Sequence, residues 1–143
     1  MKGNKKMFLF GLVLIAVIAA GAIIVVGSTL SKKPVKNNYA TKYLTADDDS
    51  TTLQLKKGDK VNLELKDYGD GGYSWEIVTL DEKILSLTER SDSEPSGLMG
   101  DFGNDIWTFT AEKTGSIKLE LKCSRPWDKT DVCETFTVQV EVK

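Results

Sequence analysis

The chain has 143 residues and a formal net charge of −2, with 19 Lys and Arg against 21 Asp and Glu. This length allows one domain plus a short additional segment, and the charge gives no support for a nucleic-acid partner. The sequence contains no His, which excludes Ser-His-Asp and Cys-His catalysis as well as His-ligated zinc. Carboxylate or Lys chemistry stays open in principle, but the composition argues against an enzyme.

The N-terminal part of the chain contains a long apolar segment. Residues 7–26 include no charged or strongly polar side chain. A helix of this length spans roughly 30 Å, the thickness of the hydrocarbon core of a bilayer. Residues 1–6 form a basic tail with Lys2, Lys5 and Lys6, and basic tails favour the cytoplasmic side. We therefore expect one N-terminal transmembrane helix in a single-pass protein of the cell membrane, with the rest of the chain extracytoplasmic.

A cleaved signal peptide is the alternative interpretation of this segment. Signal peptides have apolar regions of about 7–15 residues followed by a small-residue cleavage site. Ala20-Gly21-Ala22 resembles such a site, but the apolar run continues past it to Val26, which favours the anchor. Cleavage would give a secreted protein. Under either interpretation the remaining chain is exported.

Residues 27–50 are polar, contain one Pro and show no sustained period. This composition predicts a flexible or semi-extended linker, in which Tyr43-Leu44 could already belong to a first strand. Residues 47–49 are all Asp but lack the spaced oxygen ligands of a calcium loop. We therefore expect them to form the solvated end of the linker, and we expect no metal site.

From about residue 51 onward, apolar and polar residues alternate, as in Val61-Asn62-Leu63-Glu64-Leu65. Lys57-Gly58-Asp59 indicates a turn and Lys113-Thr114-Gly115 a hairpin. Short strands at this spacing, without an amphipathic helix, indicate an all-β sandwich or barrel over residues 51–143. The expected strands cover residues 52–55, 61–65, 73–78, 84–88, 106–111, 116–123 and 135–142. The expected core consists of the inward-facing Leu53, Leu55, Val61, Leu63, Leu65, Trp75, Ile77, Trp107, Phe109, Leu119, Leu121, Phe136, Val138 and Val140.

Three loops interrupt the alternation, at residues 67–72, 91–105 and 124–132. The second is long for so small a domain, and long loops in compact domains are usually functional. Loops between alternate strands of a sandwich collect at one end and can form a composite surface. Trp75 and Trp107 lie within alternating strands and are expected in the core, whereas Trp127 lies in the third loop and is expected to be exposed.

Cys123 and Cys133 flank the third loop. In an exported protein such a pair predicts a disulfide, worth about 3 kcal/mol in the chain-entropy model for so short a loop. A stapled loop is also preorganised, so less entropy is lost when it binds a partner. Two Cys without His provide too few soft ligands for a metal.

Short motifs lie in the three loops: Tyr68-Gly69-Asp70-Gly71-Gly72-Tyr73, Gly100-Asp101-Phe102-Gly103 and Arg125-Pro126-Trp127. In order and spacing they resemble the three binding loops of chagasin-like cysteine protease inhibitors, and the resemblance covers roughly residues 51–143. The third motif matches the family's Arg-Pro-Trp fully. The first keeps the final Gly and aromatic residue of Asn-Pro-Thr-Thr-Gly-aromatic, with Asp70-Gly71 in place of the Thr pair. The second keeps the outer Gly residues of Gly-x-Gly-Gly, with Phe102 between them.

The resemblance implies an immunoglobulin-like sandwich and a reversible, non-covalent inhibitor that blocks the active-site cleft of a papain-like cysteine protease. All residues of the three motifs are then protease-binding candidates. The first loop would lie nearest the catalytic Cys-His pair, where its Gly residues permit close backbone approach. Trp127 would be an aromatic anchor, and Arg125 would pair with the protease or brace its own loop through Asp128 or Asp131. A one-to-one inhibitor is expected to be a monomer.

Two other functional classes are alternatives to an inhibitor. The anchor and linker suggest a cell-surface β-sandwich adhesion or assembly module without inhibitory activity. A carboxylate hydrolase would need a pair such as Asp70 and Asp101, but nothing in the sequence brings these two together. The sequence therefore predicts a binding protein rather than an enzyme, with no cofactor.

Overall fold

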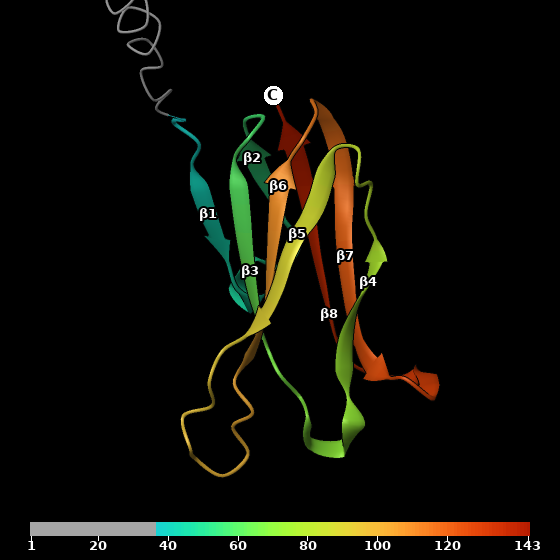
Figure 1. The fold of residues 1–143 in the computed structure, drawn as a ribbon. Coiled ribbons are helices and arrows are strands. Elements are labelled where there is room, and N and C mark those ends of the chain that lie inside the picture. Colours follow the sequence, from blue (N-terminus) through green and yellow to red (C-terminus); the bar gives the residue numbers. More distant parts are fainter. Residues whose placement is uncertain (1–36) are drawn as a thin grey trace, which may run out of the picture. The chain divides into compact units, whose positions relative to one another are not determined.

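The computed structural model describes residues 37–143, of which residues 38–143 form one compact unit. Two four-stranded sheets form a β-sandwich (Figure 1), which confirms the all-β prediction. Within the described residues, no helix is long and apolar enough to cross a membrane. The predicted basic tail 1–6 and transmembrane segment 7–26 lie outside these residues.

The first sheet has the strand order β1-β3-β6-β5, formed by β1 (Thr41–Leu44), β3 (Lys60–Lys66), β6 (Asn104–Ala111) and β5 (Leu85–Asp92). The second has the order β2-β8-β7-β4, formed by β2 (Thr51–Leu55), β8 (Asp128–Val142), β7 (Gly115–Arg125) and β4 (Ser74–Thr79). β1 runs parallel to β3 and β2 parallel to β8, and the other neighbours are antiparallel. Two single-turn 3₁₀ helices, η1 (Ala46–Asp48) and η2 (Asp70–Gly72), complete the fold.

One core fills the space between the sheets. Val61, Leu63 and Leu65 of β3 are at most 2% exposed, because alternate side chains of a strand point to the same face. All predicted core residues are buried except Leu53 and Ile77, which are partly buried at the edge of the cluster. Trp75 and Trp107 are both 3% exposed, as expected. The core also contains residues that the alternation did not single out: Leu44, Leu85, Ala111, Ile117, Cys123 and Val142.

The C-terminal part of the expected linker belongs to the sandwich. β1 lies beside β3 and buries Leu44 in the core. Thr45 and Asp48 form a capping box at η1, in which the Thr45 amide donates to the Asp48 carboxylate at 2.8 Å. The Asp49 carboxylate accepts a hydrogen bond from the Thr137 amide at 2.7 Å. The Asp run is therefore a structured corner of the sandwich rather than the end of a linker, with Asp47 and Asp49 exposed to solvent as expected. A four-residue strand with one buried side chain is too short for alternation to show.

The two ends of the sandwich differ in character. The chain enters at the end that carries the β2–β3, β4–β5 and β6–β7 turns and Lys143 (Figure 1). There the buried Asp59 carboxylate accepts hydrogen bonds from the amides of Lys56 and Ala40, both at 2.9 Å, and these bonds lower the pKa of Asp59. Asp59 thus fastens the entering chain to the β2–β3 turn. The opposite end carries the β3–β4, β5–β6 and β7–β8 connections (Figure 1).

Candidate functional site

Three connections meet at the end of the sandwich opposite the chain entry (Figure 1). Loop 1, residues 67–73, joins β3 to β4; loop 2, residues 93–103, joins β5 to β6; and the third is the tip of the β7–β8 hairpin. The Asp67 amide donates to the Gly103 carbonyl oxygen at 3.0 Å, which links loop 1 to loop 2. The three predicted loops therefore lie at one end, although loop 2 is shorter than predicted because β5 and β6 continue into it.

Loop 1 contains the tight turn η2. Gly71 and Gly72 have φ values of 79° and 77°, in the left-handed region that disfavours residues with a Cβ atom. Tyr73 ends the turn, so β4 begins one residue later than predicted, at Ser74. A Cβ atom added to Gly71 would face Arg125 and Tyr73, and one added to Gly72 would collide with Trp127, so these glycines let loop 1 pack against the hairpin. Asp70 lies in η2 by its backbone.

The third predicted loop is mostly strand. β7 continues through Arg125 and β8 begins at Asp128, so that only Pro126 and Trp127 form the turn. Ser124 pairs with Val132 and Arg125 with Asp128, so β8 bulges at residues 129–131. Alternation did not reveal these strand ends because both of their faces are largely solvated and therefore polar.

A disulfide joins Cys123 and Cys133, with Cα atoms 5.4 Å apart, as the sequence predicted. Cys123 is fully buried, whereas Cys133 lies at the surface. Arg125 follows Cys123 by two residues, and Asp131 precedes Cys133 by two. The disulfide therefore fixes the distance between β7 and β8 close to the positions of Arg125 and Asp131.

The Arg125 guanidinium connects the hairpin to loop 1. Its Nε donates to the Gly71 carbonyl oxygen at 3.0 Å, and its Nη1 lies 2.9 Å from Asp131 Oδ2. It also lies over the Tyr73 ring, 4.7 Å from the centroid. The Tyr73 hydroxyl donates to Asp131 Oδ1 at 3.0 Å, and this bond raises the pKa of Tyr73. Of the two alternatives for Arg125, the structure supports the brace, and the partner is Asp131.

Trp127 combines exposure with a contact to loop 1. Its side chain is 72% exposed, as predicted. A Cβ atom added to Gly72 would nevertheless collide with its indole ring. Trp127 therefore supports the loop 1 backbone with one edge and offers the rest of its surface to a partner.

Loop 2 is held by Asp101. Hydrogen bonds from the Ser96 hydroxyl, the Gly103 amide and the Ser96 amide lower the pKa of Asp101 to about 2. The two amides lie 2.9 Å (Gly103) and 2.7 Å (Ser96) from its oxygens. Gly103, at φ 82°, lies so close to the Ser93 carbonyl oxygen that a side chain would collide with it. Asp101 thus braces loop 2 internally, and its contact with a protease stays a prediction.

Exposed apolar side chains are concentrated at the loop end. Trp127 and Phe102, 42% exposed, were expected here, but the sequence analysis missed Leu98 and Met99, 73% and 104% exposed, and Val132, 43% exposed. The other large exposed apolar residues of the described chain are Tyr39, Tyr43 and Val78. A signal for loop 2 was present, because Leu98-Met99 lies between two Gly residues in an otherwise polar segment. Exposed apolar groups gathered on one surface are typical of a protein-binding site.

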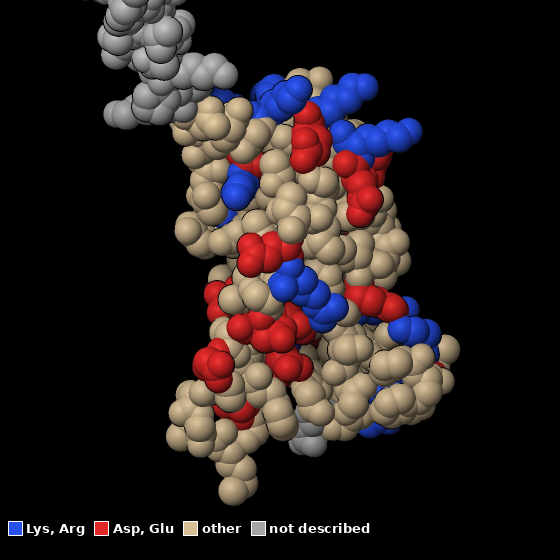
Figure 2. Space-filling model, viewed as in Figure 1, with Lys and Arg blue, Asp and Glu red and all other residues tan. Residues whose placement is uncertain are grey.

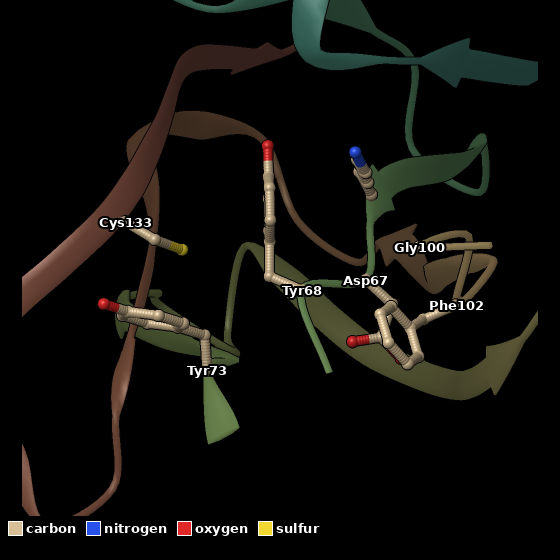
Figure 3. A pocket seen from close by; sticks show the side chains of 7 residues that line it. Asp67, Tyr68, Tyr73, Gly100, Phe102 and Cys133 are labelled. Atoms are coloured by element: carbon tan, nitrogen blue, oxygen red, sulfur yellow. The ribbon is translucent and has the colours of Figure 1, made fainter. Parts of the chain in front are cut away.

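A cavity of about 310 Å³ lies among loop 1, loop 2 and the hairpin, and Figure 3 shows its lining. Tyr68 and Tyr73 lie toward Cys133, whereas Phe102 and Gly100 lie on the other side. The Tyr68 hydroxyl donates to Glu134 Oε2 at 2.7 Å, which raises the pKa of Tyr68. Tyr68 therefore joins loop 1 to β8, a contact that the sequence did not suggest.

No group of His, Cys, Asp or Glu side chains in residues 37–143 is arranged to hold a metal ion. Asp101, one of the two carboxylates considered for hydrolysis, already accepts hydrogen bonds within loop 2. The loop end thus combines exposed aromatic and aliphatic groups with charged side chains that brace the loops, which suits the binding of a protein surface.

Comparisons with known proteins agree with this description. A sequence model of the family described as Chagasin family peptidase inhibitor I42 matches residues 54–140. Amoebiasin-1 of Entamoeba histolytica is 29% identical over 100 residues, 70% of this chain and 98% of its own. Amoebiasin-2 of the same organism is 31% identical over 88 residues, 60% of this chain and 72% of its own. The crystal structure of EhICP2, a cysteine protease inhibitor from Entamoeba histolytica, superposes with a TM-score of 0.67 at 25% identity, covering 74% of this chain and 98% of EhICP2.

The chain therefore belongs to the chagasin family of peptidase inhibitors. This confirms the resemblance drawn from the three motifs. Because the family consists of inhibitors, its membership agrees with the expectation of a binding protein rather than an enzyme.

Proposed function

We propose that this protein is a reversible, non-covalent inhibitor of papain-like cysteine proteases, and that its three-loop end blocks the active-site cleft. The observation that carries the proposal is the braced, apolar loop end of a chain in the chagasin family. Relatives in this family include a protein described as a cysteine protease inhibitor. The proposal assigns binding to the three motifs, with loop 1 entering the cleft between loop 2 and the Pro126-Trp127 turn.

The geometry of loop 1 suits a segment that enters a cleft without being cleaved. Proteolysis requires a peptide bond held in near-attack geometry at the nucleophile. Loop 1 is instead a 3₁₀ turn with left-handed Gly71 and Gly72, and the Gly71 carbonyl oxygen already accepts a hydrogen bond from Arg125. Extending this segment into a substrate conformation would break the Arg125 contact. The brace therefore keeps the loop bound as a turn and slows its cleavage.

The aromatic and aliphatic side chains supply the apolar contacts on either side. Trp127 is a large, rigid group that loses little conformational entropy on binding. Phe102, Leu98 and Met99 of loop 2 offer apolar area on the other flank. Because the Asp101 hydrogen bonds and the disulfide fix both flanks in advance, binding costs less ordering entropy.

The proposal predicts that the inhibitor shields the catalytic thiol. Papain would be mixed with the oxidised protein of residues 37–143 and then treated with iodoacetamide, and alkylation of the active-site Cys would be followed by mass spectrometry. We expect concentration-dependent protection, recovery of protease activity on dilution and recovery of intact inhibitor. If a micromolar concentration of the protein left the catalytic Cys of papain-like proteases open to alkylation, the result would contradict the proposal and favour the surface adhesion module.

We also propose that residues 7–26 anchor the protein in the cell membrane, with the inhibitor domain outside. The support is the length of the uninterrupted apolar run and the Lys residues that precede it. The full chain should stay with membranes after carbonate extraction, with residues 38–143 accessible to external protease. A secreted protein whose N-terminus begins after residue 22 would instead establish a cleaved signal peptide.

A further inference from the structure

The chain-entry end of the domain carries a cluster of Lys side chains that the inhibitory site does not use. All are exposed and lie on β1, at the start of β3, in the turns at this end or at the last residue. We call them the lysine base: Lys42, Lys56, Lys57, Lys60, Lys83, Lys113 and Lys143. Hydrogen bonds place the turns side by side, since the Lys57 amide donates to the Lys143 carbonyl at 3.3 Å and the Gly58 amide to the Ala111 carbonyl at 2.7 Å. Figure 2 shows Lys and Arg side chains gathered at this end.

The lysine base differs from the other cations in its lack of carboxylate partners. Within the described residues, none of its members forms an ion pair, whereas five of the six other cations do: Arg90, Lys118, Lys122, Arg125 and Lys129. Residues 1–36 contain no Asp or Glu that could neutralise it. Unpaired cations gathered at one end attract an anionic partner most strongly when salt is low.

The carboxylates at this end do not cancel the charge. The buried Asp59 carboxylate accepts hydrogen bonds from two backbone amides. The Asp81 carboxylate accepts one from the Lys83 amide. Glu112 and Glu141 accept hydrogen bonds from the side chains of Ser86 and Gln54, respectively. With Glu82 they number five, against seven Lys. The rest of residues 38–143 has six basic and sixteen acidic side chains. The domain is therefore electrically polar, with a basic entry end and an acidic remainder.

Two further features indicate the type of anionic surface. A depression of about 360 Å³ lies among Lys42, Lys56 and Lys143, beside the point where the described chain begins. Tyr39, 57% exposed, lies against Gly58 at the same end, and amphipathic aromatic residues favour the headgroup level of membranes. In the sequence, Lys32, Lys33 and Lys36 precede this end and follow the apolar segment. In the sequence, only residues 27–37 separate that segment from the domain, and so few residues reach at most about 40 Å.

We propose that the lysine base docks on anionic phospholipid headgroups. In that orientation the three-loop end, in the acidic remainder of the domain, points away from the membrane, toward a protease in the surrounding fluid. Clusters of Lys near an anionic bilayer are attracted by its surface potential within about a Debye length. This inference is independent of the inhibitory role, because the two surfaces lie at opposite ends of the sandwich (Figure 1).

The test uses residues 37–143, which contain the compact unit, so that the apolar segment does not itself insert into lipid. Binding would be measured by co-sedimentation with vesicles of phosphatidylcholine alone and of phosphatidylcholine with phosphatidylglycerol. A triple variant, Lys56→Gln with Lys57→Gln and Lys113→Gln, removes three charges of the lysine base. The matched control, Lys118→Gln with Lys122→Gln and Lys129→Gln, removes three charges elsewhere. A second variant, Lys42→Gln with Lys83→Gln and Lys143→Gln, serves if the first does not fold.

We expect binding to the anionic vesicles only, weakened at least about tenfold by the lysine-base variant and much less by the control. Raising the salt from about 0.05 M to 0.5 M should abolish it. Equal binding to both vesicle types, no binding to either, or equal losses in variant and control would overturn the proposal. Binding to soluble heparin without binding to vesicles would also overturn it, in favour of a polyanionic glycan. Protease inhibition by the variants should equal that of the wild type, and it is measured separately.

Discussion

Arg125 and Gly71 lie 54 positions apart in the sequence and are joined by a hydrogen bond of 3.0 Å from the guanidinium Nε to the carbonyl oxygen. The same guanidinium pairs with Asp131 and covers the Tyr73 ring. The Arg of the Arg-Pro-Trp motif thus acts inside the protein, where it holds loop 1 against the hairpin. It is a positioning residue for the proposed binding surface.

Arg125→Lys should weaken inhibition by about tenfold, because Lys keeps the charge but cannot donate to Gly71 and Asp131 in the planar fork of Arg. The free energy of unfolding should change little, since the side chain is 35% exposed. The coupling between Arg125 and Asp131 is measured by a double-mutant cycle. Inhibition constants and urea unfolding are determined for Arg125→Lys, Asp131→Asn and the double variant. Strictly additive losses would contradict the brace and indicate that Arg125 contacts the protease directly.

Gly72→Ala should lower both stability and inhibition, because φ at this position is 77° and the new Cβ atom would meet the Trp127 ring. Gly97→Ala is the matched control, since Gly97 has φ 83° but no atom within 4 Å of the added Cβ. We expect the left-handed backbone to cost each variant about 1 kcal/mol, with a further loss only in Gly72→Ala. Thermal unfolding of both variants measures whether Gly72→Ala loses more stability than Gly97→Ala. Equal destabilisation would show that Trp127 does not press on loop 1.

Removal of the disulfide by Cys123→Ser with Cys133→Ser should lower the free energy of unfolding by about 3 kcal/mol. It should also weaken inhibition, because Arg125 and Asp131 each lie two residues from a bridged Cys. Assays of cysteine proteases contain thiols, so the state of the bridge must be checked by mass spectrometry in each assay. If the Cys123→Ser, Cys133→Ser variant inhibited the protease as strongly as the oxidised wild type, the prediction would be wrong. The hydrogen bonds between β7 and β8 alone would then set the Arg125–Asp131 distance.

Asp101→Asn should destabilise the protein in a pH-dependent way. Because hydrogen bonds lower the pKa of Asp101 from 3.8 to about 2, its ionised form stabilises the fold fully above pH 3.8. This stabilisation is lost as the pH falls through about 2. The difference in melting temperature between wild type and variant should therefore be constant above about pH 4 and shrink below it. A difference unchanged down to pH 2 would contradict the role of the carboxylate.

The strands and the core could largely be predicted from the sequence, because one buried face imposes a period of two on β3, β6 and the inner part of β8. The same signal is absent where a strand has no buried face. The outer parts of β7 and β8 around Pro126, and the polar end of β5, therefore looked like loops. Of β1, the sequence suggested only Tyr43-Leu44, because the strand contributes one side chain, Leu44, to the core.

The residues of the candidate site could be predicted by resemblance, but not their contacts. Nothing local to Arg125 indicates Gly71 as its partner, because the two meet only through the packing of β4 beside β7. Asp101 looked like an exposed loop residue, and its bonds to Ser96 and Gly103 follow from the path of loop 2. Sequence patterns report burial and turns, whereas these braces depend on the three-dimensional path of the loops.

The measurement that tests the central claim most directly is a titration of papain with the oxidised protein of residues 37–143, beside Trp127→Ala and Val78→Ala. Val78 is 52% exposed on β4 and serves as the exposed apolar control. We predict inhibition by the wild type and by Val78→Ala, and a loss of at least about tenfold, or 1.4 kcal/mol, for Trp127→Ala. Equal inhibition by all three proteins, or none by any of them against papain and related proteases, would contradict the account.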